Sequence, residues 1–307
     1  MNKIVIAGGS GFLGQVLANY FQTKANEIVI LGRSPKPSTG NIRNVAWNGR
    51  DLAEWKNELN RCDVLINLTG KSVNCRYTEK NKKEILDSRL NSNRVLGEAI
   101  RHVENPPNLW IQAASSTIYR SSFDRPMDET TGEIGDDFSM NVCKQWEKSF
   151  WEQECPRTKK IVMRIAIVLG NGGGAVPPII NLVTFGLGGM QGNGKQMVSW
   201  IHEHDFARSV EWLIANGRDK GIYNCSGLEP VTNSEFMKRF RQHWNMPIGL
   251  PSPAWLLEIG SALIGTETEL LLKSRWVWPK NLIDEGFTFT FGRLDGALGD
   301  IKLGIRK

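Results

Sequence analysis

The chain has 307 residues, 40% of them hydrophobic, and its 38 Lys and Arg against 32 Asp and Glu give a formal net charge of +6. This length and apolar content predict a globular protein with one large or two modest domains. The charges are interspersed, the apolar runs are short and the N-terminus has no basic region, which argues against nucleic-acid binding, a membrane span and a signal peptide.

Short β-rich runs alternate with helix-like stretches through the first half of the chain. Several runs are continuously apolar, which is typical of strands buried on both faces of a parallel sheet. The predicted strands are Lys3–Ala7, Glu27–Leu31, Asn44–Trp47, Asp63–Leu68, Trp110–Ala114 and Lys160–Val168. The predicted helices are Phe12–Thr23, Asp51–Leu59, Glu79–Val103 and Asp137–Glu154. This alternation predicts an α/β fold with a doubly wound parallel sheet.

The pattern changes after Gly170, where NGGGAVPPII and GLGGMQGNGKQ are too rich in glycine for regular structure. Further on, a strand at Val198–Ile201, a helix at Asp205–Ala215 and a strand at Gly221–Cys225 are expected to return to the first sheet. From Val231 the chain is mostly helical, beginning with a capping box at Thr232 and Glu235. We therefore expect a first domain at residues 1–170, completed by about 198–225, and a smaller C-terminal domain at 171–197 and 226–307.

The sequence GGSGFLG, residues 8–14, follows the first strand and opens the first helix. Glycines at 8, 11 and 14 permit a tight turn, a close approach of the backbone to a pyrophosphate, and close packing of the helix on the strand. The N–H groups at the start of the helix face the anion. In this context of strand, turn and helix, the motif predicts a dinucleotide site.

The end of the second strand indicates which dinucleotide is bound. Proteins that prefer NAD place an acidic residue about twenty residues beyond the glycines, where it binds the ribose hydroxyls. Here the position holds Gly32 and Arg33, and an arginine suits the 2′-phosphate of NADP. NADP, as NADPH, is therefore expected and NAD is less favoured, with a surface arginine as the alternative. The small residues of NLTGKSV, 67–73, suit an approaching ribose, or a simple turn.

The five cysteines give no sign of a metal site or a disulfide framework. Their spacing contains no Cys-x-x-Cys pair and no histidine at a zinc-ligand distance. Because five is odd, full pairing is impossible, and reduced thiols in the cytoplasm are the simplest account. The cysteines are Cys62, Cys75, Cys143, Cys155 and Cys225.

With these motifs, the chain resembles the extended short-chain dehydrogenase/reductases, the NAD-dependent epimerase/dehydratase family, and most closely an atypical subgroup termed sugar-nucleotide epimerase-like. The matching stretches include GGSGFLG, NLTGKSV, DSR at 87–89, RIAIVLG, GLGG, WIH, EPVTN and LLLKSRWVWPK. The resemblance implies a Rossmann domain that binds NADP, a smaller substrate domain, and a small-molecule substrate that resembles a nucleotide sugar. It leaves the oligomeric state open.

The resemblance also implies which residues bind the cofactor. From their own context, Glu84 and Arg89 could equally belong to a solvated helix face. The implied residues are Gly8, Ser10, Gly11, Phe12, Leu13, Gly14, Gly32, Arg33, Leu68, Thr69, Gly70, Glu84, Arg89 and Val168.

The catalytic pattern of the family is incomplete in this chain. Members use a serine after the fifth strand and Tyr-x-x-x-Lys on the next helix, in which the lysine lowers the tyrosine pKa and the tyrosine moves the proton. Ser115 occupies the serine position. Anchored on Glu147, the tyrosine and lysine positions fall at Ser139 and Cys143, which cannot replace that pair. Tyr119, the phenol nearest to Ser115 in the sequence, is the candidate donor.

Two functions fit these observations. The first is an NADP(H)-dependent, epimerase-like oxidoreductase whose acid–base chemistry has moved off the usual tyrosine. The second is a non-catalytic NADP(H)-binding sensor or scaffold, which the missing tyrosine favours. The glycine-rich segments Gly172–Gly174 and Gly186–Lys195 favour an enzyme, because flexible segments beside a cleft suit a substrate lid.

Overall fold

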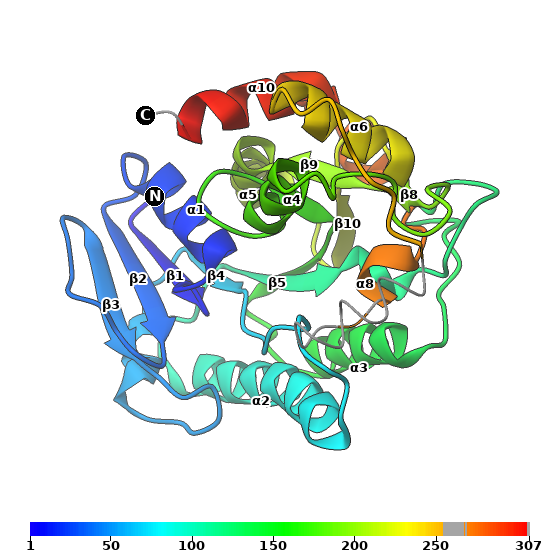
Figure 1. Ribbon diagram of the computed structural model, residues 1–307. Coiled ribbons are helices and arrows are strands. Elements are labelled where there is room, and N and C mark those ends of the chain that lie inside the picture. The colour runs from blue at the N-terminus through cyan, green and yellow to red at the C-terminus, as the bar shows by residue number, and fades with distance from the viewer. Residues whose placement is uncertain (254–266, 268, 306–307) are drawn as a thin grey trace.

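Seven parallel strands form the central sheet of the computed structural model, which describes residues 1–253, 267 and 269–305 (Figure 1). Their order is β10-β6-β5-β4-β1-β2-β3, and every neighbouring pair is parallel. The strands are β1 Lys3–Ala7, β2 Glu27–Gly32, β3 Ile42–Ala46, β4 Val64–Asn67, β5 Leu109–Ser115, β6 Lys159–Ile165 and β10 Gly221–Cys225. The predicted doubly wound α/β sheet is confirmed.

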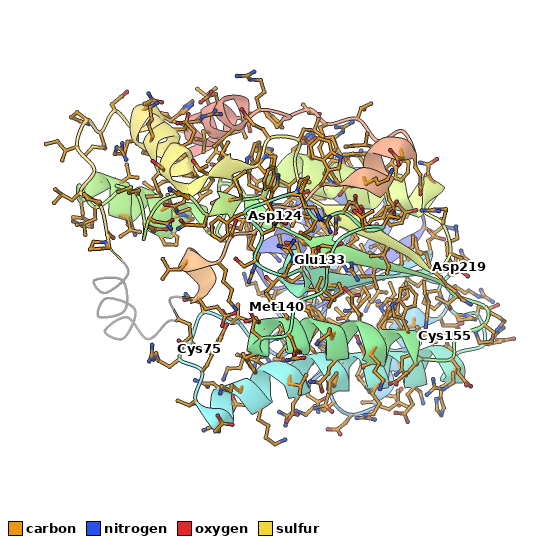
Figure 2. All side chains as sticks on the ribbon, turned by 90° about the vertical axis from the view of Figure 1, so that its right-hand side faces the viewer. Cys75, Asp124, Glu133, Met140, Cys155 and Asp219 are labelled. Atoms are coloured by element: carbon orange, nitrogen blue, oxygen red, sulfur yellow. The ribbon has the colours of Figure 1, made fainter. Side chains whose placement is uncertain are left out.

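Helices cover both faces of this sheet. On one face lie α1 Phe12–Phe21 and α5 Glu203–Asn216, and on the other lie α2 Glu79–His102 and α3 Phe138–Trp151 (Figure 1). Figure 2 shows α2 and α3 side by side from a second direction.

The alternation of side chains along β1 explains why this strand is apolar throughout. Ile4 and Ile6 belong to the core cluster that contains Leu17 of α1, whereas Val5 packs in the cluster that contains Leu96 of α2. Both faces of the strand are therefore buried, as a covered parallel sheet requires.

Side-chain caps define where several helices begin. The Thr78 hydroxyl accepts a hydrogen bond from the N–H of Asn81 at the start of α2, and Asp137 caps α3 in the same way. The predicted capping position at Thr232 is confirmed: its hydroxyl accepts from the N–H of Glu235 at the start of α6, Asn233–His243.

The prediction that Val198–Ile201 returns to the main sheet is wrong. The segment forms two short strands, β8 Met197–Val198 and β9 Trp200–His202, in separate two-stranded sheets with β11 Val231–Thr232 and β7 Ile167–Leu169. The chain changes partner after β6: the N–H of Ala166 donates to Cys225, but that of Ile167 donates to Ser199. Only the predicted strand Gly221–Cys225 joins the central sheet, as β10.

Two further segments differ from their predictions. The segment expected to be irregular contains helix α4, Val176–Thr184, which has proline in its first turn, where a missing N–H costs nothing. The predicted helix at Asp51–Leu59 is a 3₁₀ helix, η1, at Glu54–Leu59.

The C-terminal helices are α6, α8 Glu269–Leu272, α9 Lys280–Asp284 and α10 Leu294–Ile305. Helices α6 and α10 pack with α4, whereas α9 packs against β10. Helices α4, α6 and α10 share a core cluster that includes Val183, Phe240 and Leu298 (Figure 1). Residues 254–266, 268 and 306–307 of the predicted C-terminal domain lie outside the described residues, and the domain boundaries remain a prediction. Within the described ranges, none of the helices has the length and apolar character needed to cross a membrane.

Helix α5 begins with a histidine cap, two residues before the predicted start at Asp205. His202 is the N-cap, and its Nδ1 accepts a hydrogen bond from the N–H of His204 at 3.2 Å. Asp205 is buried in the first turn, where it accepts hydrogen bonds from the N–H groups of Thr290 and Phe291 at 2.9 and 2.7 Å. Asp205 thereby holds the C-terminal segment against α5.

The buried His202 should make stability depend on pH. Burial lowers its pKa to about 4, so the folded protein binds a proton more weakly than the unfolded chain. Neutral His202 makes its full contribution to the free energy of unfolding above the pKa of histidine in the unfolded chain, about 6.5. This contribution is lost as the pH falls towards 4, the pKa in the folded protein. We expect the wild type to lose about 1–2 kcal/mol between pH 7 and pH 5 from this group.

Urea unfolding of His202→Asn at the two pH values tests this expectation. Asparagine keeps an acceptor for the N–H of His204 but does not titrate. The variant should therefore lose less stability than the wild type between pH 7 and pH 5. An identical loss in both proteins would show that His202 does not contribute.

Candidate active site

The glycine loop forms at the carboxyl end of β1, where the strand order reverses between β1 and β4. Gly8 has φ +73°, and a Cβ there would lie 2.9 Å from the Cα of Thr69. A Cβ on Gly14 would lie 2.3 Å from the Cα of Gly9. Because glycine has no Cβ, the turn can pack closely against α1 and against the chain after β4.

Gly11 differs from the other glycines of the loop. It is the N-cap of α1 with an extended backbone, and the nearest atom to a Cβ would be the Gly8 oxygen at 3.8 Å. No side chain caps α1, and no acidic residue stands in its first turn. The start of this helix is therefore open towards the crevice at the switch point, where ligands of doubly wound sheets bind.

Thr69 presents an unpaired hydroxyl beside the glycine loop. Its Oγ1 is buried without a hydrogen-bond partner, and its N–H donates to Oδ1 of Asn67 at 3.0 Å. Asn67 is fully buried, and its Nδ2 donates to three side chains, which belong to Ser92, Asn93 and Gln112. This network fixes the chain after β4 and leaves the Thr69 hydroxyl available to a ligand.

Arg33 extends from the end of β2 beside the same loop. A Cβ on Gly32 would lie 3.7 Å from Oγ of Ser10, so the end of β2 adjoins the glycine turn. Arg33 is exposed and forms no ion pair with the carboxylates that the structure describes. Its guanidinium is free to bind an anion.

Phe12 and Val168 meet at a second glycine turn. A Cβ on Gly174 would lie 2.9 Å from Cε1 of Phe12 and 3.4 Å from the Val168 oxygen. Leu13 follows Phe12 in α1 and packs partly buried against the core. The turn after β7 therefore lies directly on the first residue of α1, as the predicted roles of Phe12 and Val168 require.

Glu84 and Arg89 hold the loop after β4 against α2. Glu84 forms an ion pair with Lys71. Nη1 of Arg89 donates to the carbonyl oxygens of Lys71 and Ile85 at 3.1 and 2.8 Å, and a Cβ on Gly70 would lie 3.0 Å from the guanidinium. Both side chains thus face the loop that contains Leu68 and Thr69. Arg89 is therefore not part of a solvated helix face.

A cavity of about 100 Å³ lies between α2, α3 and the end of β5. Ser115 lines it, and so do Ser139 and Cys143, the residues at the family's tyrosine and lysine positions. Burial raises the pKa of the Cys143 thiol to about 12, so it remains protonated and is not a nucleophile. The other lining residues are Val73, Tyr77, Ile85, Arg89, Thr117, Phe138, Val142 and Trp146.

Tyr119 does not line this cavity. Its buried hydroxyl donates to Oδ1 of Asn224 at 3.0 Å and accepts from Nη1 of Arg164 at 2.8 Å. Arg164 in turn forms a buried ion pair with Glu147 at 2.8 Å. The structure therefore gives the Tyr119 hydroxyl a structural role between β6, β10 and α3, and does not bring it together with Ser115 at the cavity.

Tyr77 lines the cavity, although no feature of the sequence identified it. It stands one residue before Thr78, the N-cap of α2, and sequence patterns do not report which side chains meet across a fold. The periodicity of α2 could place Ile85 and Arg89 on one face, but not the loop that precedes the helix.

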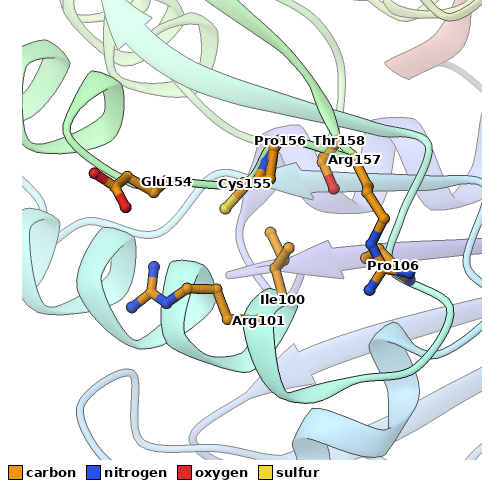
Figure 3. A pocket seen from close by; sticks show the side chains of 8 residues that line it. All are labelled: Ile100, Arg101, Pro106, Glu154, Cys155, Pro156, Arg157 and Thr158. Atoms are coloured by element: carbon orange, nitrogen blue, oxygen red, sulfur yellow. The ribbon is translucent and has the colours of Figure 1, made fainter.

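A larger hollow, of about 280 Å³, lies at the opposite edge of the sheet (Figure 3). It is lined by residues at the starts of β5 and β6, including Pro106 and Thr158, and by Arg101 and Arg157. Doubly wound sheets bind ligands at the carboxyl ends of their strands, and this hollow adjoins the amino ends. The candidate site is therefore the region beside Gly11, at the carboxyl ends of β1 and β4, together with the cavity at Ser115.

Comparison with known proteins identifies the family of this chain. Residues 4–226 match the NAD dependent epimerase/dehydratase family, and residues 252–301 match a domain of unknown function, DUF1731. Epimerase family protein YfhF of Bacillus subtilis is 32% identical over 97% of this chain and 97% of its own length.

Solved structures extend the comparison. The crystal structure of human epimerase family protein SDR39U1 (isoform2) with NADPH has a TM-score of 0.86 at 28% identity, covering 98% of this chain and 99% of that chain. MoeE5 in complex with UDP-glucuronic acid and NAD, at 18% identity and a TM-score of 0.78 over 99% of each chain, shares the fold alone. The family match spans most of the chain, and the protein belongs to the NAD-dependent epimerase/dehydratase family.

Proposed function

We propose that this protein is an NADP(H)-binding, epimerase-like oxidoreductase that acts on a small molecule resembling a nucleotide sugar. The observation that carries the proposal is the surround of the glycine turn, where the open start of α1, the unpaired Thr69 hydroxyl and the end of β2 with the exposed Arg33 adjoin the same turn. These groups fit a pyrophosphate, a ribose and a 2′-phosphate respectively. The human relative that was crystallised with NADPH supports the choice of cofactor.

The same region supports the full set of proposed cofactor residues. The glycine turn would hold the pyrophosphate, Gly32 and Arg33 the 2′-phosphate, and the loop after β4 the adenosine and ribose. When bound, the cofactor supplies or accepts a hydride. The proposed residues are Gly8, Ser10, Gly11, Phe12, Leu13, Gly14, Gly32, Arg33, Leu68, Thr69, Gly70, Glu84, Arg89 and Val168.

Ser115 is the proposed residue that orients the substrate. Its Oγ accepts a hydrogen bond from the N–H of Thr117 at 3.2 Å, which leaves its hydroxyl hydrogen free to donate to a substrate oxygen. A fixed donor of this kind stabilises the negative charge that develops on a carbonyl oxygen. Ser115 thus needs a separate proton donor, which Ser139 and Cys143 cannot provide.

A non-catalytic NADP(H) sensor or scaffold is the second candidate function. It is favoured by the serine and the protonated cysteine that occupy the family's tyrosine and lysine positions. Tight binding of NADPH with no hydride transfer to any carbonyl compound tested would favour this candidate over an oxidoreductase. We further propose a cytoplasmic location, because all five cysteines are free thiols.

Cofactor preference provides a direct test of the role of Arg33. The guanidinium should favour NADPH over NADH by at least about tenfold, which is about 1.4 kcal/mol. Titration calorimetry of Arg33→Ala should show most of that preference lost. Lys36→Ala, which removes an exposed charge from the same loop, is the control and should keep the preference. Equal affinities of the wild type for the two cofactors would contradict the proposal.

Gly11→Val tests the pyrophosphate site. The backbone of Gly11 is extended at φ −79°, so valine fits the fold, but its side chain would enter the space above the turn. We expect NADPH affinity to fall by about 100-fold or more, with a native circular dichroism spectrum. Gly296→Val in α10, where a Cβ meets nothing within 4 Å, is the control. Unchanged affinity in Gly11→Val would place the cofactor elsewhere.

Ser139 and Cys143 on α3, which stand where the family pattern has tyrosine and lysine, should restrict the activity of the protein. We expect purified protein to bind NADP(H) but to show little activity on common nucleotide sugars. With a substrate found by screening, Ser115→Ala should cost about 2–4 kcal/mol of transition-state stabilisation, as loss of one oriented donor does. Rapid epimerisation of an ordinary UDP-sugar by the wild type would refute the altered active site, and a wild-type rate in Ser115→Ala would refute the role of this serine.

A further inference from the structure

The cavity at Ser115 occupies space that larger side chains fill in the usual family pattern. Helix α3 presents Ser139 and Cys143 there, in place of the expected tyrosine and lysine. Two other side chains reach the cavity from the opposite wall: Tyr77, just before α2, and Arg89 within α2. The cavity therefore contains a phenol and a cation, as the family pattern does, but here they come from α2 and the residue before its N-cap, not from α3.

Tyr77 has a fixed ring and an unsatisfied hydroxyl. Its ring packs edge-on against Phe138, with centroids 4.9 Å apart, and its N–H donates to Oε1 of Glu267 at 2.7 Å. The hydroxyl oxygens of Tyr77 and Ser139 are both buried, and neither has a hydrogen-bond partner among the residues that the structure describes. A buried polar group without a partner costs about 1–3 kcal/mol, so this pair of hydroxyls is well placed to receive a ligand.

Two guanidinium groups act on Tyr77. Arg89 lies 4.7 Å above the ring of Trp146, and Nη1 of Arg275 is buried without a partner. Neither arginine forms an ion pair with a carboxylate among the described residues. Burial lowers the pKa of both, and their charges act on Tyr77 and on Cys143. Burial and the charges of Glu269 and Glu267 raise the pKa of Tyr77, so Arg89 and Arg275 are the positive groups that would offset them if a phenolate formed.

We propose that Tyr77 is the proton-transfer residue of this protein and that Arg89 supplies the positive charge that lysine supplies in the family pattern. This inference rests on the proposed function as an NADP(H)-dependent oxidoreductase. In the reducing direction, the substrate carbonyl carbon accepts a hydride from the reduced cofactor, and the carbonyl oxygen takes the proton of the Tyr77 hydroxyl. The resulting phenolate is stabilised by Arg89 and Arg275 and regains a proton from solvent.

The other tyrosines are less suited to this role. All four tyrosines of the chain are described, and Tyr77 is the one that lines the cavity. Tyr20 and Tyr223 bond to Glu211 and Glu285, and Tyr119 is held by Arg164. Burial raises the pKa of Tyr77, so the hydroxyl remains protonated at neutral pH and can donate.

The test uses the full protein labelled with ¹³C at Cζ of tyrosine, which gives one NMR signal for each of the four phenols. Tyr77→Phe assigns one signal and keeps the ring packing, and Tyr119→Phe is the matched control. The charged and titratable groups facing Tyr77 are Arg89, Arg275, Glu267, Glu269 and Cys75. We expect saturating NADP⁺ to lower the pKa of Tyr77 by about one unit or more, because the nicotinamide ring is cationic.

A second variant isolates the role of the cation. Arg89→Ala should raise the Tyr77 pKa by about one unit, because the phenolate loses a positive neighbour, whereas Arg101→Ala, at a distant exposed site, should leave it unchanged. With a carbonyl substrate that the wild type reduces, Tyr77→Phe should lower kcat by about 10²–10⁴-fold. Tyr119→Phe should keep kcat.

The outcomes separate the inference from the proposed function. If calorimetry shows that NADP⁺ binds while the Tyr77 signal and pKa stay the same, or if Tyr77→Phe keeps the wild-type kcat, the inference is overturned and the cofactor site stands. If the Tyr119 signal responds instead, Tyr119 takes the role. If NADP⁺ does not bind at all, the proposed function fails and the inference fails with it.

Discussion

The site depends on the contact between the turn after β1 and the chain after β4. These neighbouring strands lead in opposite directions across the sheet, so a crevice opens between their carboxyl ends. Gly8 has a positive φ, and a Cβ at this position would lie only 2.9 Å from the Cα of Thr69, so glycine lets the two loops meet. A larger residue would separate the two loops, and Gly11, Thr69 and Arg33 would no longer face one space.

Helix α3 is held against the sheet near its C-terminal end. Glu147 and Arg164, whose side chains are each 8% exposed, join this helix to β6 through a buried ion pair, and Tyr119 completes the network. Removing one partner of such a pair typically costs about 3–5 kcal/mol. Helix α3 is therefore held in place independently of the residues on its cavity face, which allows Ser139 and Cys143 to occur there without loss of the fold.

Local patterns in the sequence predicted most of the scaffold. Continuous apolar runs identified the strands of the central sheet, and the glycine spacing identified the turn at Gly8. The exceptions arise where distant contacts decide the structure: β8 and β9 separate because they pair with different strands, β11 and β7, which belong to different sheets. The cavity was not predictable for the same reason, since Tyr77 and Ser139 are 62 positions apart and meet only in the folded chain.

The burial of Asp205 bears on how separable the two halves of the protein are. This carboxylate lies at the start of a helix of the nucleotide-binding half, and its donors at Thr290 and Phe291 belong to the C-terminal half. A chain cut between the two family matches would remove these two backbone donors and leave Arg208, 2.9 Å away on the same helix, as the partner of the buried carboxylate, which would destabilise the first region. These two hydrogen bonds therefore couple the stability of the first matched region to the presence of the segment around Thr290.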